Sequence, residues 1–114
     1  LFVCLLAYYV QWHLRQAWKP LLFDDEELGT DRLVRDPVKP ALPSDSAQRK
    51  KSTRRTTADQ PVHSFRTLLD HLRGRVRCHV SVTADTGTHG YDQVTAADPL
   101  QADALRLVAE HAAA

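Results

Sequence analysis

A run of four consecutive acidic residues, Asp24 to Glu27, is the first feature of this sequence that could do chemistry. Two-metal nucleases use carboxylates that converge from separate elements on ions roughly 4 Å apart. Four adjacent carboxylates that follow a helix instead point in different directions and repel one another. The run therefore predicts a solvated acidic turn at the end of a helix and not a metal site.

The histidines and cysteines do not have a spacing that is typical of a metal or catalytic site. The six histidines form neither an HxH nor an HExxH pair, and they are His13, His63, His71, His79, His89 and His111. Cys78 and His79 are adjacent in an expected strand, so they should point to opposite faces, and no zinc site is predicted. Ser64, Asp70 and His71 can be written as a triad, but neighbouring helical residues diverge, so we reject it.

A cluster of basic residues is the candidate binding surface. Its members are Arg49, Lys50, Lys51, Arg54 and Arg55. A flexible basic arm would contact DNA phosphates without sequence preference and with strong salt dependence. No aromatic residue is interleaved to stack on bases, so a merely solvated charged segment is the alternative. Trp12, His13 and Arg15 could also approach DNA or a partner, but packing is the favoured interpretation for them.

The first residues predict a helix from Leu1 to about Trp18 that is ended by Pro20. Its first turns are apolar all round, so we expect a helix buried on more than one side. The uncharged stretch lacks signal-peptide features and falls short of the roughly 20 residues that a bilayer needs. A buried helix is therefore favoured over a membrane span. Cys4 in this helix and Cys78 further on are predicted to be buried thiols in a reducing compartment.

The chain of 114 residues, with a formal net charge of +1 and a mean hydropathy of −0.39, has room for one ordinary domain. We divide it into an N-terminal helix with the residues that follow it (1–23), a flexible linker (24–61) and a small C-terminal module (62–114). The middle part is rich in Pro and polar residues and has no apolar period, which predicts disorder or an extended course, with room for a helix near Ala47–Arg55.

The C-terminal part predicts a helix, a hairpin and a second helix, so the fold class is α+β. Ser64 is a good N-cap for an amphipathic helix, and Asp98-Pro99 with Gln101 predicts the start of another. Alternating residues from Val76 to Thr83 predict a half-buried strand, with a turn at 85–90 and a weaker returning strand at 91–95. A unit of this size is marginal unless it packs on something larger.

The N-terminal segment through Pro20-Leu21-Leu22-Phe23-Asp24-Asp25-Glu26 resembles the C-terminal end of bacterial insertion-sequence DDE transposases of the insertion-sequence-four type. The block Val62–Leu69 and the terminal Pro99-Leu100-Gln101 helix are similar to later parts of the same family. The resemblance covers nearly the whole chain and is specific in the first 27 residues and at Val62–Leu69. The chain has no Met and begins in an apolar run, which we interpret as the tail of a longer protein.

The resemblance implies that the first helix comes from the end of a ribonuclease-H-like domain in the full-length parent. There two Asp and one Glu would hold Mg²⁺ for DNA cleavage and strand transfer. That Glu precedes the segment seen here, so no catalytic residue and no cofactor are carried over to this chain, which we expect to be inactive alone.

Three hypotheses follow. The favoured one is a transposase fragment that acts in DNA transposition through its parent, in the cytoplasm and without a membrane partner. The second is a non-enzymatic DNA-binding or interaction remnant. The third, a small protein anchored to a membrane by Leu1–Val10, is weaker. The sequence does not determine an oligomeric state.

Overall fold

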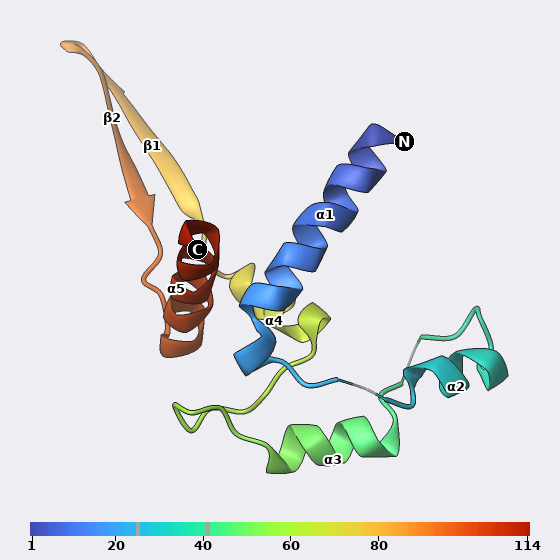
Figure 1. The fold of residues 1–114 in the computed structure, drawn as a ribbon. Helices are drawn as coiled ribbons and strands as arrows, with labels where there is room; N and C mark the ends of the chain where they lie inside the picture. Colours follow the sequence, from blue (N-terminus) through green and yellow to red (C-terminus); the bar gives the residue numbers. More distant parts are fainter. Residues whose placement is uncertain (25, 41) are drawn as a thin grey trace.

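A computed structural model of the chain describes residues 1–24, 26–40 and 42–114. The elements of this part, in chain order, are α1 (Phe2–Ala17), the 3-10 helix η1 (Lys19–Leu21), α2 (Leu28–Val34), α3 (Asp45–Thr53), α4 (Phe65–Leu72), β1 (Arg77–Ala84), β2 (Gly87–Val94) and α5 (Pro99–Ala113) (Figure 1). The protein is therefore a small α+β chain with five α-helices and one antiparallel hairpin in its described part. The predicted fold class is confirmed at this coarse level.

Local capping signals start two of the helices where the sequence predicted. The side chain of Ser64 accepts a hydrogen bond from the Thr67 N–H at the start of α4. At the start of α5, Asp98 accepts the Gln101 N–H while the Gln101 side chain accepts the Asp98 N–H, and Pro99 follows the cap. Such caps satisfy N–H groups that a helix leaves unpaired, and they depend only on residues close in the sequence.

A small core lies where the end of α1 and η1 meet α4 and α5. Leu68 of α4 and Ala104 of α5 have no exposed surface. The Trp18 indole packs beside them, and its Nε1–H donates to the Ala104 carbonyl at 2.9 Å. The other buried members of this cluster are Ala17, Leu21 and Leu100. Leu21 of η1 thus packs within the chain.

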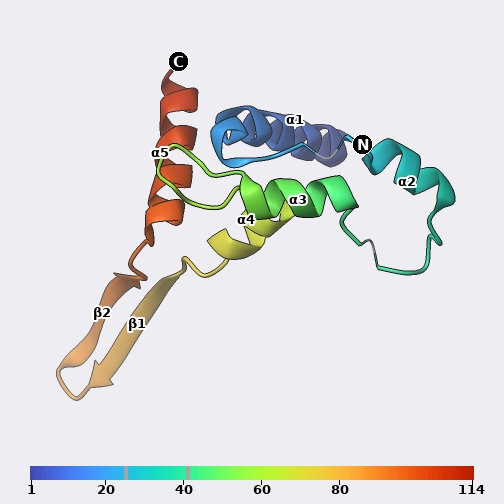
Figure 2. The same cartoon turned by 90° about the horizontal axis from the view of Figure 1, so that it is seen from below.

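The hairpin of β1 and β2 extends away from the helices, as Figures 1 and 2 both show. Arg77 pairs with Val94 at its base and Ala84 with Gly87 at its tip, so Asp85 and Thr86 make a tighter turn than predicted. The radius of gyration is 19.0 Å, whereas a compact domain of this length has about 13 Å. The prediction of a half-buried strand is wrong, because no other element among the residues that the structure describes covers either face of β1, and only its Val80 is partly buried.

The first three turns of α1 are exposed, although the sequence predicted burial on more than one side. Leu1 is 97% exposed, Phe2 is 77% exposed and Val3 is 74% exposed. Only the C-terminal end of α1 reaches the core, and the other end stays exposed among the residues that the structure describes. Cys4 lies in the exposed part of α1 and Cys78 in the exposed strand β1, so both thiols are exposed, which corrects the prediction of buried thiols.

The described part of the segment 24–61, for which disorder or an extended course was predicted, carries α2 and α3. The helix α3 agrees with the helix expected near Ala47–Arg55, and α2 was not expected. Ser44 caps α3 by accepting the Ala47 N–H, and Ala47 is buried. Asp25, a member of the acidic run, lies outside the described residues. None of the helices in the described ranges is both long and apolar enough to cross a membrane.

Candidate nucleic-acid interface

The helix α3 and the residues that follow it position the basic cluster. Arg49, Lys50 and Lys51 lie in the second half of α3, while Arg54 is its C-cap residue and Arg55 follows. All of these residues except Lys50 are exposed. Positive charges in the last turn of a helix interact favourably with the negative end of the helix dipole, so the position of Lys50 and Lys51 stabilises α3. Four exposed cations within seven residues can contact phosphates.

Lys50 differs from the rest of the basic cluster because its ammonium group is engaged within the protein. Its Nζ donates to the Asp24 carbonyl at 2.8 Å and to Glu26 Oε1 at 3.1 Å. The Lys50 side chain keeps only 14% of its exposure, against 80% for Glu26. Lys50 therefore contacts Asp24 and Glu26 of the acidic run, which sets it apart from the four exposed cations of the basic cluster.

A turn after α3 returns the chain to the core. Thr56 receives the Gln60 N–H through its side chain at 3.1 Å, and its own N–H donates to the Gln60 carbonyl at 2.8 Å. His63 then pairs with η1, since its N–H donates to the Leu21 carbonyl at 3.0 Å and its carbonyl accepts the Phe23 N–H at 3.1 Å. Arg54 and Arg55 thus lie in a segment that hydrogen bonds connect to the core on its C-terminal side.

The side chain of His63 lies close to two other cationic or titratable groups. Its ring is 6.1 Å from that of His71, centroid to centroid. Burial lowers the pKa of His63, and the nearby positive charges of His71 and Lys51 lower it further. The neutral imidazole is therefore favoured at this position, next to the basic cluster.

His71 has a different carboxylate partner from the one considered in the sequence. Its Nε2 lies 2.6 Å from Asp98 Oδ2, while Asp70 approaches Arg73 at 3.7 Å. The Ser64 hydroxyl is used by Thr67 at the cap of α4. Ser64, Asp70 and His71 therefore do not form a triad. The Gln101 N–H, and then His71, hold the pKa of Asp98 below its usual value.

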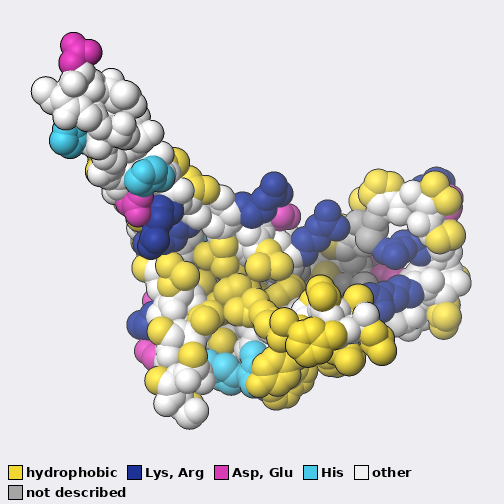
Figure 3. Space-filling view, turned by 90° about the horizontal axis from the view of Figure 1, so that it is seen from above, with side chains coloured by type: hydrophobic (Ala, Val, Ile, Leu, Met, Phe, Trp, Pro, Cys, Tyr) yellow, Lys and Arg dark blue, Asp and Glu magenta, His cyan; other side chains and the backbone are white. Residues whose placement is uncertain are grey.

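A second surface of the molecule is apolar. Hydrophobic side chains gather over the middle of the face in Figure 3, and Lys and Arg side chains lie mainly around them. The exposed hydrophobic residues of α1 include Phe2, Leu5, Tyr8, Tyr9 and Trp12. An apolar surface of this kind is typical of an interface with another protein surface.

Two of the three residues considered for DNA contact in α1 pack within the chain. Arg15 lies over the Phe65 ring at 4.4 Å, and His13 Nδ1 is 3.1 Å from His111 Nε2. The packing interpretation is confirmed for these two residues. The pairing of His13 with His111 could not be found from the sequence, because the two residues are 98 positions apart.

The described residues contain no group of three or more His, Cys, Asp or Glu side chains that could hold a metal ion. Comparison of the chain with protein-family models, curated proteins and solved structures found no match.

Proposed function

We propose that this chain is the C-terminal part of an insertion-sequence DDE transposase and acts in DNA transposition as an accessory region. The observation that carries the proposal is the sequence resemblance of residues 1–27 and of Val62–Leu69 to that family. In the proposal α1 is the helix that ends a ribonuclease-H-like domain, and α4, the hairpin and α5 form an accessory module.

The exposed end of α1 supports this placement. Its apolar side chains need a partner surface, and Leu5 and Tyr8 are 60% and 70% exposed. A helix that closes a larger domain would bury them, at about 25 cal/mol for each Å² of apolar surface. The opposite, C-terminal end of α1 contacts the small core of this chain through Ala17 and Trp18, so α1 would join the two parts.

The exposed cations of the basic cluster give the accessory region its task. Arg49, Lys51, Arg54 and Arg55 would contact the phosphates of transposon or target DNA without reading bases. Hydrogen bonds of Lys50 and His63 hold both ends of this segment, so its positive charges would contact DNA from a defined position. We assign no catalytic step and no metal to this chain.

DNA binding by the chain is tested with a fluorescent duplex of arbitrary sequence. We expect binding that weakens steeply with salt, and a variant with Arg49, Lys51, Arg54 and Arg55 changed to Ala should bind more weakly with a smaller salt slope. A matched control changes four exposed cations elsewhere, which are Arg32, Lys39, Arg66 and Arg73. An equal loss of DNA affinity in the two variants would mean that net charge alone causes the effect, and it would overturn the assignment of the interface.

The transposase proposal has its own test, the DNA that codes for the protein upstream of Leu1. An open frame that encodes a domain with two Asp and one Glu in DDE order would support it. A frame that encodes an unrelated domain would overturn it. We expect the chain alone not to nick DNA with Mg²⁺, and DNA binding without such a parent would instead favour the non-enzymatic binding remnant.

A further inference from the structure

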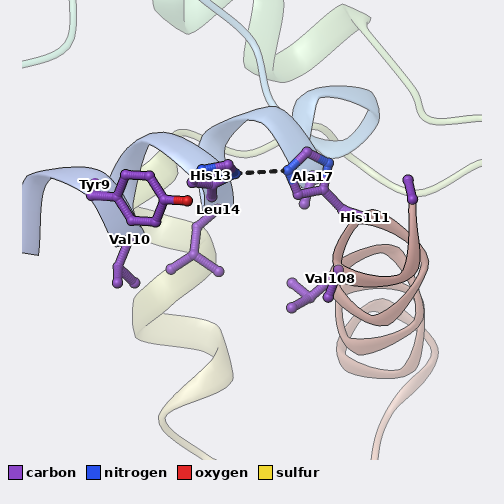
Figure 4. Close-up of a pocket in the computed structure, with 9 residues that line it drawn as sticks. Tyr9, Val10, His13, Leu14, Ala17, Val108 and His111 are labelled. Atoms are coloured by element: carbon purple, nitrogen blue, oxygen red, sulfur yellow. Dashed lines mark hydrogen bonds between the residues drawn. The ribbon is translucent and has the colours of Figure 1, made fainter. Parts of the chain in front are cut away.

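Two histidines face each other across the contact between the first and last helices. His13 of α1 and His111 of α5 direct ring nitrogens toward one another, with Nδ1 and Nε2 3.1 Å apart (Figure 4). Both side chains are partly buried, and both line a pocket of about 500 Å³ between the helices. The function proposed above uses neither residue.

The His13 ring is held in place from two sides. The Tyr9 ring packs edge-on against it at 4.4 Å, and the Trp12 ring does the same at 4.9 Å. His111 belongs to the last turn of α5 and its ring lies 5.4 Å from that of His13. One of the paired nitrogens is therefore fixed by packing before any ligand arrives, which reduces the ordering cost of binding.

We propose that His13 and His111 form a two-imidazole site for a borderline transition-metal cation such as Zn²⁺. Zinc–imidazole bonds of about 2.0–2.1 Å in a tetrahedral site place two ligand nitrogens about 3.3 Å apart. The nitrogens of this pair lie 3.1 Å apart in a hydrogen bond, so a bound ion would replace the proton between them once both ring nitrogens present lone pairs to it. Water in the adjoining pocket completes the coordination.

The chemistry of the pair selects the class of metal. Imidazole suits Zn²⁺, Cu²⁺ and Ni²⁺, whereas Mg²⁺ prefers oxygen ligands and would not be held here. Because the ligands of this site come from helices at the two ends of the sequence, bound metal links α1 to α5 directly and stabilises their contact.

The other pair of histidines that lie near each other is a weaker competitor. His63 and His71 have ring centroids 6.1 Å apart, and His71 Nε2 is already 2.6 Å from Asp98 Oδ2. A metal there would have to displace a contact with a carboxylate, whereas at His13 and His111 it would displace only the hydrogen bond between the two imidazoles. His63→Gln is therefore a suitable control, and His89→Gln on the exposed hairpin is a second.

Titration of the purified chain with Cu²⁺ tests the site, because a paramagnetic ion bound by His13 lies next to Trp12 and quenches its fluorescence. We expect saturable quenching that Zn²⁺ reverses by competition, and an electron paramagnetic resonance signal with two imidazole nitrogens. His111→Gln should weaken binding at least about tenfold, because one imidazole then acts without the second. His63→Gln and His89→Gln should leave binding unchanged.

His13→Phe provides a second variant that keeps the ring packing against Tyr9 and Trp12 but removes the ligand. It should also weaken binding at least about tenfold while the helical circular dichroism is retained. A Cu²⁺ signal from a single imidazole, equal binding in wild type and both ligand variants, or loss of binding in His63→Gln would each overturn the proposal.

Discussion

His71 Nε2 lies 2.6 Å from Asp98 Oδ2, and this contact joins the last turn of α4 to the cap of α5. Gln101 adds a second connection, because its side-chain amide donates to the His71 carbonyl at 3.0 Å. The hairpin lies between α4 and α5 in the sequence. At its base the Arg75 side chain donates a hydrogen bond to the Thr95 carbonyl at 3.0 Å. The base of the hairpin is thus held even though its strands are exposed.

Replacement of Asp98 by Ala should lower the melting temperature at pH 7, because it removes the cap of α5 and the partner of His71. The lowered pKa of Asp98 means that its carboxylate stabilises the fold above the unfolded-state pKa near 4. This stabilisation is lost as pH falls through the folded-state pKa. The difference between variant and wild type should therefore shrink in strong acid, as thermal unfolding by circular dichroism will show. Identical melting at pH 7 would contradict this role.

The pKa of His63 should lie below the usual value near 6.5 in an NMR titration. Because folding lowers this pKa, the stability that neutral His63 provides is present above pH 6.5 and decreases as pH falls through the folded value. Lys51→Ala removes one of the repelling charges and should raise the pKa. Arg73→Ala is the matched control and should leave it unchanged. An unaltered His63 pKa in Lys51→Ala would place the basic cluster further from His63.

Lys50→Ala should weaken DNA binding less than Arg54→Ala, since the Lys50 ammonium is bonded to Asp24 and Glu26. Loss of Lys50 should instead loosen α3, with a smaller helical signal. Both variants remove one positive charge, so they are matched in net charge. Comparison of their DNA affinities at one low salt concentration separates a structural lysine from a contacting arginine. Equal losses would show that Lys50 leaves its partners to contact DNA.

The isolated chain should self-associate through the apolar end of α1. A double variant, Leu5→Lys with Tyr8→Lys, should have a molar mass closer to that of the monomer when it is measured by light scattering after size-exclusion chromatography. Leu33→Lys in α2 is the control, because Leu33 is 88% exposed but lies outside α1. A wild-type chain that is monomeric at every concentration would contradict the prediction.

Leu68→Ala should lower the free energy of unfolding by about 2–5 kcal/mol, because Leu68 is fully buried in the core. Val82→Ala in β1 is the contrasting change, since Val82 is 57% exposed. This substitution at an exposed position should change the free energy of unfolding by no more than about 0.5 kcal/mol. Urea unfolding followed by circular dichroism measures both, and equal effects would contradict the position of the core.

Features set by neighbouring residues could be predicted, and those set by distant contacts could not. Ser64, Asp98 and Gln101 act within one helical turn, so their caps were readable from the sequence. The alternation from Val76 to Thr83 correctly predicted a strand but not its cover, because alternation indicates which side chains share a face and not whether anything packs on it.

The candidate sites divide in the same way. The basic cluster was visible as a run of charges, but the engagement of Lys50 depends on Glu26, 24 residues away. The contact between His13 and His111 spans nearly the whole chain, and no local spacing signals it. The same holds for the exposure of α1, where apolar residues predicted a burial that this chain does not itself provide.

The two-stranded sheet has a consequence for amide hydrogen exchange. In an antiparallel pair, successive residues of each strand direct their N–H groups alternately toward the partner strand and away from it. Neither β1 nor β2 has a second neighbour in this sheet, so the outward groups meet solvent. Exchange along the hairpin should therefore alternate between slow and fast from one residue to the next, and addition of a further strand to either edge would slow the fast amides of that strand.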